Sequence, residues 1–148
     1  MIRKLQKMWK TAAVSTKEQR GHDVSLAVAA LMVEVMRMDG HLHEAERSSM
    51  MVALEKRFDL SETEIHALIE QASAEVDKAL DLHQFTSIVV KGFSTQERIV
   101  ILTELWAVAM ADGIVDPYEE QIIRRMADLL GIHHTQFIEA KLSAELQF

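Results

Sequence analysis

The sequence predicts an all-α protein, a compact bundle of seven to eight helices. The chain has only five Gly and one Pro among its 148 residues, so few positions interrupt a helix. Its apolar residues recur at intervals of three and four through most of the chain, which is the spacing of a helix face. A segment that occurs twice further predicts that two related three-helix units make up the bundle.

The first half of the chain is read from its apolar spacing. Residues 1–20 are predicted to be a basic N-terminal arm containing a short amphipathic helix, with a break near residues 15–22. An almost wholly apolar helix should cover residues 23–38 and lie at the centre of the domain. Another helix is expected at about 43–57.

Capping boxes mark the beginnings of two further helices. Ser61 with Glu64, and Ser94 with Glu97, have the three-residue spacing at which a serine and a glutamate satisfy each other's backbone amides. They predict helices over about 62–79 and 95–111.

The remaining helices are predicted from other terminal residues. Asp81 should cap a shorter helix that runs through Val90 and is ended by Gly92. Asp116-Pro117 should begin a helix ending at Gly131, because Pro is favoured at the first helical position and Gly just after the last. A last helix is expected at about 134–145.

The duplicated segment consists of an apolar helix, an Asp-Gly turn and a glutamate six residues further on. Val35–Gly40 is matched by Val108–Gly113, and Glu46 by Glu119, with an offset of 73 in both cases. We therefore predict two pseudo-twofold-related units, about 22–79 and 94–146, joined by a helix at 81–91, within one domain of residues 21–148.

Charge and composition exclude several classes of protein. Residues 1–20 contain six Lys/Arg and one Glu, a net charge of +5, whereas residues 21–148 contain ten Lys/Arg and 22 Asp/Glu, a net charge of −12. The acidic body argues against binding to nucleic acid. There is no Cys, which excludes disulfides and thiolate zinc sites. No continuous apolar segment resembles a secretory signal, so a cytoplasmic location is expected.

The second Asp-Gly turn is a candidate metal site. Asp112, Asp116 and Glu119 lie on one short turn, and three carboxylates suit a hard cation such as Ca²⁺, Mg²⁺ or Mn²⁺. An EF-hand is rejected, because Val108 and Met110 occupy positions where that loop needs oxygen ligands.

The first turn offers a more mixed set. Asp39, His43 and Glu46 would supply nitrogen and oxygen ligands, better suited to Mn²⁺, Ni²⁺ or Zn²⁺. A structural interpretation of both turns stays open, since Asp-Gly and Asp-Pro-x-Glu are also ordinary helix ends and helix starts.

Other chemistry has weaker support in the sequence. The adjacent His133 and His134 point in different directions on a helix and make a poor zinc chelate. The chain lacks Gly-x-Ser-x-Gly, a Gly-rich phosphate loop and His-Glu-x-x-His, so a metal-dependent hydrolase using the same carboxylates is only a third alternative. The basic arm could lie on an anionic membrane, dock on a partner protein or pack on its own acidic body. A homodimer is a further open possibility.

The two turns and their flanking helices resemble the TerB-like tellurite-resistance family over about residues 22–140. The resemblance is carried by the runs Trp106–Glu120 and Met38–Glu46, together with Phe85-Thr86 and Arg98-Ile99. It implies an all-helical, pseudo-twofold cytoplasmic domain associated with stress responses, alongside membrane-bound and calcium-binding partner proteins.

The resemblance also implies that acidic turn residues bind metal. By position, these are Asp39 and Glu46 in the first copy and Asp112, Asp116 and Glu119 in the second, with His43 standing where the second copy has Asp116. The expected function is a non-enzymatic module that binds divalent cations at these turns and docks other proteins. The alternative is a scaffold that uses the basic arm at a membrane surface or partner, with purely structural turns.

Overall fold

Seven α-helices and no strands make up the described part of the chain, which is residues 2–38 and 44–147 of a computed structural model; side chains are described for residues 20–38 and 44–147. The all-α prediction is therefore confirmed. The helices are α1 (Ile2–Arg37), α2 (Glu44–Phe58), α3 (Glu62–Lys78), α4 (His83–Gly92), α5 (Thr95–Met110), α6 (Pro117–Leu129) and α7 (His134–Gln147).

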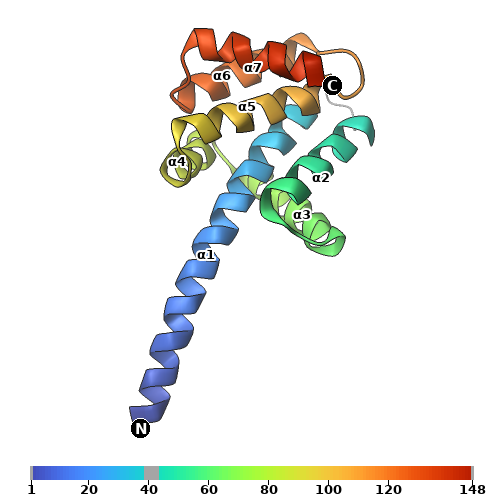
Figure 1. The fold of residues 1–148 in the computed structure, drawn as a ribbon. Helices are drawn as coiled ribbons and strands as arrows, with labels where there is room; N and C mark the ends of the chain where they lie inside the picture. The colour runs from blue at the N-terminus through green and yellow to red at the C-terminus, as the bar shows by residue number, and fades with distance from the viewer. Residues whose placement is uncertain (1, 39–43, 148) are drawn as a thin grey trace.

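α1 is one continuous helix of 36 residues. The prediction of a short first helix, a break near residues 15–22 and a second helix was wrong. Ser, Thr and Gly weaken a helix only modestly, and this stretch contains no Pro to end it. Its N-terminal half extends away from the other helices (Figure 1), so the arm does not fold back onto the acidic body.

α1 and α5 are the two central helices of the body. Every residue from Ala27 to Val33 is at most 1% exposed, because α2, α3, α4, α5 and α6 all contact α1. On α5, Leu105–Ala109 are buried in the same way. A helix that is apolar on all sides is stable in water only when it is enclosed. This enclosure confirms the predicted central place of residues 23–38.

The outer helices each bury one face against this centre. Met50 and Leu54 are the buried residues on the apolar face of α2, and α7 packs on α5, where the rings of Trp106 and Phe137 lie 5.5 Å apart. Trp106 is fully buried, as expected from its place in the predicted central helix.

Both predicted capping boxes are present. The Ser61 hydroxyl accepts the Glu64 amide at 3.2 Å while the Glu64 carboxylate accepts the Ser61 amide at 3.1 Å. Ser94 and Glu97 make the same pair at 3.2 and 3.0 Å. The backbone hydrogen bond from Ser61 lowers the pKa of Glu64, since a carboxylate that accepts an amide is favoured in its charged form.

The turns before α4 and after α6 are also stabilised by nearby residues. An Asp81 carboxylate oxygen accepts the His83 amide at 2.8 Å as α4 begins. Gly131, just after α6, has a φ of +71°, which only glycine adopts without strain. The Arg98 guanidinium donates to the Leu130 carbonyl and so ties the start of α5 to the end of α6.

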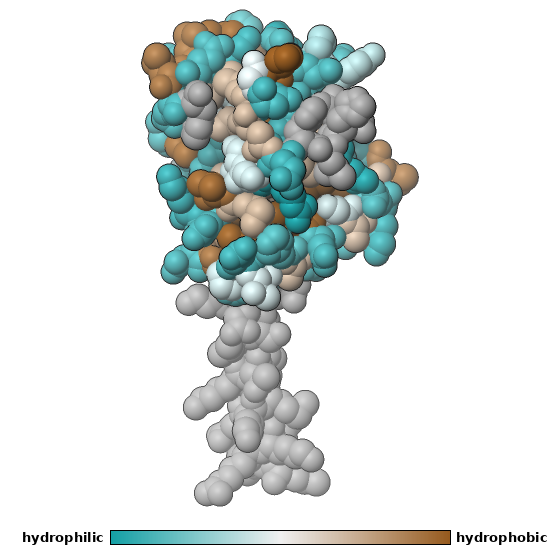
Figure 2. Space-filling model, turned by 90° about the vertical axis from the view of Figure 1, so that its right-hand side faces the viewer, coloured by the Kyte–Doolittle hydropathy of each residue, from teal (hydrophilic) through white to brown (hydrophobic). Residues whose placement is uncertain are grey.

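The face of the body seen in Figure 2 is predominantly hydrophilic, with separate hydrophobic side chains among the polar ones. Within the described residues, no helix combines the length and the apolar character needed to cross a membrane.

Candidate functional site

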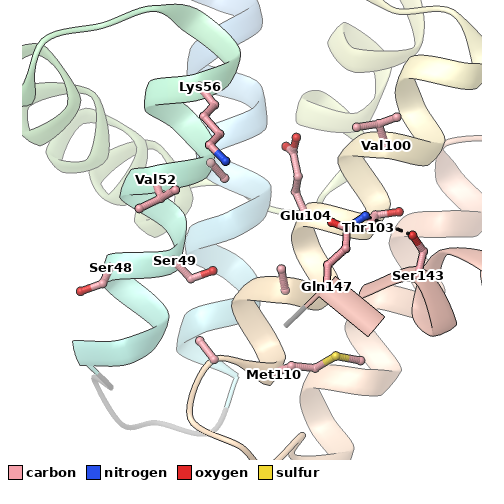
Figure 3. A pocket seen from close by; sticks show the side chains of 13 residues that line it. Ser48, Ser49, Val52, Lys56, Val100, Thr103, Glu104, Met110, Ser143 and Gln147 are labelled. Atoms are coloured by element: carbon pink, nitrogen blue, oxygen red, sulfur yellow. Dashed lines mark hydrogen bonds between the residues drawn. The ribbon is translucent and has the colours of Figure 1, made fainter. Parts of the chain in front are cut away.

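The two Asp-Gly turns join α1 to α2 and α5 to α6. The beginning of α2 and the end of α5 lie side by side (Figures 1 and 3), and the two helices are in contact. Asp39 and His43, two of the predicted ligands of the first turn, lie outside the described residues. The site is therefore built from the second turn and from Glu46.

The second turn is closed by its own backbone and by Asp112. The Gly113 amide donates to the Met110 carbonyl at 2.9 Å, and an Asp112 carboxylate oxygen accepts the Ile114 amide at 3.1 Å. Gly113 has a φ of +90°, a conformation that strains any residue with a side chain. The Asp-Gly pair thus forms a tight turn directly after α5.

Asp116 and Glu119 begin α6 as a reciprocal pair. An Asp116 carboxylate oxygen accepts the Tyr118 amide at 2.8 Å, and a Glu119 carboxylate oxygen accepts the Asp116 amide at 3.0 Å. Pro117 stands at the first helical position. This arrangement confirms the predicted helix start, and it means that both carboxylates satisfy amides which α6 itself cannot satisfy.

Glu46 and Glu119 are the most unusual residues of the two turns. Each is the third residue of its helix, α2 or α6, and each is fully buried, with 0% of its surface exposed. Taking a carboxylate out of water costs several kcal/mol unless hydrogen bonds or a positive charge compensate. The helix N-termini provide part of this compensation through their amides and their dipoles.

The described side chains do not form a ready-made metal cluster. Across residues 20–38 and 44–147, no three His, Asp or Glu side chains converge closely enough to hold a metal ion. Asp112 and Asp116 face backbone amides of their own turn instead. In this arrangement the second turn works as a helix cap, and a cation would have to draw these carboxylates away from those amides.

The C-terminal histidine pair does not point to zinc either. His133 and His134 are both exposed at the start of α7. The His133 amide donates a hydrogen bond to the side-chain oxygen of Gln136 at 3.2 Å, and the His134 ring stacks on the Phe137 ring with their centroids 6.1 Å apart. These contacts help to begin α7.

A groove lies beside the second turn, between α2 and α5, and α7 closes one side of it (Figure 3). Its volume is about 590 Å³. Val52 and Val100, on opposite walls, leave 51% and 48% of their surfaces exposed. Met110 lines the end next to the second turn. We call this feature the α2–α5 groove.

The two walls of the groove are held together by an ion pair. Arg57 of α2 donates to both carboxylate oxygens of Glu104 on α5, at 2.5 and 3.0 Å. The Arg57 guanidinium also lies 5.8 Å from the centre of the Phe93 ring. Two parallel hydrogen bonds fix geometry better than a single one, so this pair sets the spacing of α2 and α5. This ion pair could not be predicted from local sequence patterns, since the partners are 47 residues apart.

The comparisons with known proteins agree with this architecture. The model of the family described as tellurite resistance protein TerB matches residues 25–142. The fold is also similar to the crystal structure of a protein of unknown function from Porphyromonas gingivalis W83, with a TM-score of 0.62 and 16% identity, over 84% of this chain and 89% of that one. No curated protein matches the chain.

Proposed function

This chain belongs to the family of tellurite resistance protein TerB, and we propose that it is a non-enzymatic, cytoplasmic stress-response module that binds a divalent cation at its acidic turns and docks other proteins. The ligands would be Asp112, Asp116 and Glu119 in the second turn, and Asp39, His43 and Glu46 in the first. Ca²⁺, Mg²⁺ and Mn²⁺ are the cations that such oxygen-rich sets prefer.

The observation that carries this proposal is the matched burial of Glu46 and Glu119. Both stand at the third position of a helix that follows an acidic turn, and both are completely enclosed. An exposed capping glutamate, such as Glu64 or Glu97, does the same capping work without the cost of desolvation. Enclosing a carboxylate at both turns is explained if each turn also holds positive charge.

The matching positions also support a duplicated architecture. The second half of α1 followed by α2 and α3 would form one unit, and α5 followed by α6 and α7 the other, with α4 as the connection. We propose that each unit contributes one acidic turn at a matching position, with the second turn, which has three carboxylates, as the principal cation site.

Cation binding at the second turn has to compete with helix capping. To bind the cation, Asp112 and Asp116 would each give up the hydrogen bond that they accept from a backbone amide. Losing such a capping hydrogen bond costs about 1 kcal/mol. Because Ca²⁺ accepts six to eight oxygen ligands in flexible geometry, water and backbone carbonyls would complete the coordination. Binding would therefore be modest in affinity and would reshape the turn.

The direct test is calorimetric titration of the chelator-stripped protein with Ca²⁺, Mg²⁺ and Mn²⁺. The matched variant is Asp112→Asn with Asp116→Asn, because Asn caps a helix as well as Asp does but carries no charge. The proposal expects one cation to bind the native protein and to lose at least tenfold in affinity in this variant. Equal affinity in both proteins would contradict it.

A scaffold with purely structural turns is the second candidate. It is favoured by the amide contacts of Asp112, Asp116 and Glu119, which explain these residues as caps. It predicts no heat of binding for any of the three cations, with function residing in surfaces such as the α2–α5 groove.

A further inference from the structure

The strongest unexplained features are the projecting half of α1 and the α2–α5 groove. Residues 2–20 of the arm (residues 1–20) extend away from the body as part of one continuous helix (Figure 1). The groove presents Val52 and Val100 to solvent on its two walls. We propose that the arm of one copy of this protein docks in the α2–α5 groove of a second copy.

The pattern of the arm suits a groove with apolar walls on an acidic body. At 100° per residue along a helix, Ile2, Leu5, Trp9 and Ala12 fall within one narrow arc. Five Lys/Arg in the first seventeen residues fall on the opposite side. This is the pattern of a helix that binds in a groove through one face and leaves its charges outside.

The lengths of the two features agree. The groove follows α5 from Val100 to Ala111, which is about 16 Å at 1.5 Å per residue. The apolar positions of the arm run from Ile2 to Ala13, again about 16 Å. A second copy therefore offers a site that matches the arm in length.

Charge favours a copy of this protein as the partner. The arm carries +5 and the body −12, so the arm of one copy is attracted to the body of another over distances of about 10 Å. Because α1 is continuous, the arm cannot turn back to its own groove. Contact within one molecule is thereby excluded, and contact between molecules remains.

The placement of α1 disfavours a flat membrane surface as the alternative. Five other helices contact the second half of α1, so the body stands out from the helix axis. An amphipathic helix binds a bilayer by lying in the plane of its surface. A straight α1 could not bring the whole arm into that plane without the body meeting the membrane first, whereas the end of a helix can enter a groove freely.

The test begins with the mass of the full-length protein, measured by light scattering after gel filtration. The docking proposal expects dimers, or longer head-to-tail species, at about 100 µM. Val52→Lys with Val100→Lys should shift the protein to monomer, because two charged side chains then stand where the apolar face of the arm would pack. Leu80→Lys with Val90→Lys is the control, since it makes the same charge change at exposed apolar residues outside the groove.

A mixing experiment separates arm–groove contact from pairing between two arms. Leu5→Ser with Trp9→Ser should also be monomeric alone. Mixed with the groove variant, it should form a 1:1 complex, because one protein supplies an intact groove and the other an intact arm. Pairing between arms would leave the groove variant associated on its own, and that result would overturn the proposal.

Two further outcomes would also overturn it. One is a native protein that stays monomeric at every concentration tested. The other is a monomer that sediments with vesicles of phosphatidylcholine and phosphatidylglycerol and loses this binding when Leu5 and Trp9 are replaced, which would assign the arm to a membrane. Neither outcome depends on cation binding, so the proposed function is tested separately.

Discussion

Asp116 provides a quantitative test of how the second turn works. Its carboxylate accepts the Tyr118 amide at 2.8 Å at the start of α6. Replacing Asp116 with Ala removes this acceptor and also removes a negative charge at a helix N-terminus. The first loss costs about 1 kcal/mol, and the second costs about 0.3–1 kcal/mol.

Asp116→Asn separates these two contributions, because it keeps the acceptor and removes only the charge. The free energy of unfolding should therefore be about 1 kcal/mol lower for the Ala variant than for the Asn variant. That difference corresponds to about 2–4 °C in melting temperature for a domain of this size. In urea, it corresponds to a midpoint lower by about 0.3–1 M.

The assay is urea unfolding followed by circular dichroism, with chelator present so that no cation contributes. Parallel transitions with equal slopes are needed for the free energies to be compared. If Ala and Asn variants unfold at the same midpoint, Asp116 is not a cap. The turn would then have to be held by other contacts, and the predicted competition between capping and cation binding would lose its basis.

Three further substitutions test the helices themselves. Gly21→Ala should raise the free energy of unfolding by up to about 1 kcal/mol. Gly21 lies within the continuous α1, and no described atom comes within 4 Å of an added Cβ. An unchanged melting temperature and an unchanged helical signal would argue against a continuous α1. Gly131→Ala should lower the free energy of unfolding by roughly 1–2 kcal/mol, since Gly131 has a φ of +71°. An unchanged free energy of unfolding would contradict the left-handed conformation of this residue. Glu64 has a pKa lowered from 4.5, so its contribution to stability is present above pH 4.5 and is lost as the pH falls through the window below it. The Glu64→Gln variant should therefore lose less stability than the native protein between pH 4.5 and pH 2, measured by acid unfolding followed by circular dichroism. Identical acid unfolding profiles would count against the hydrogen bond from the Ser61 amide to the Glu64 carboxylate.

Local signals in the sequence were sufficient for most helix boundaries. Ser61, Ser94 and Asp116 each begin a helix as predicted, because a cap depends on residues three positions apart and needs no distant partner. The break predicted near residues 15–22 failed for a related reason. Weak helix formers lower helical stability only slightly, and no residue there forces the chain to turn.

The site was predictable only in part, because its environment depends on tertiary packing. The sequence identified Glu46 and Glu119 as equivalent residues, but their complete burial depends on the helices around them. Val52 and Val100 look like ordinary apolar helix positions in the sequence. Only the separation of α2 from α5, fixed by Arg57 and Glu104, shows that they line a groove.

A thermal melt decides whether the acidic turns bind a divalent cation. Chelator-stripped protein would be melted alone and with Ca²⁺, Mg²⁺ or Mn²⁺ at about a hundred times the dissociation constant found by titration, where a ligand specific for the folded state adds about 2.7 kcal/mol. We predict a rise of about 5–10 °C for one cation, lost in the Asp112→Asn, Asp116→Asn variant. An unchanged melting temperature with all three cations at millimolar concentration would contradict the account and leave the turns as helix caps.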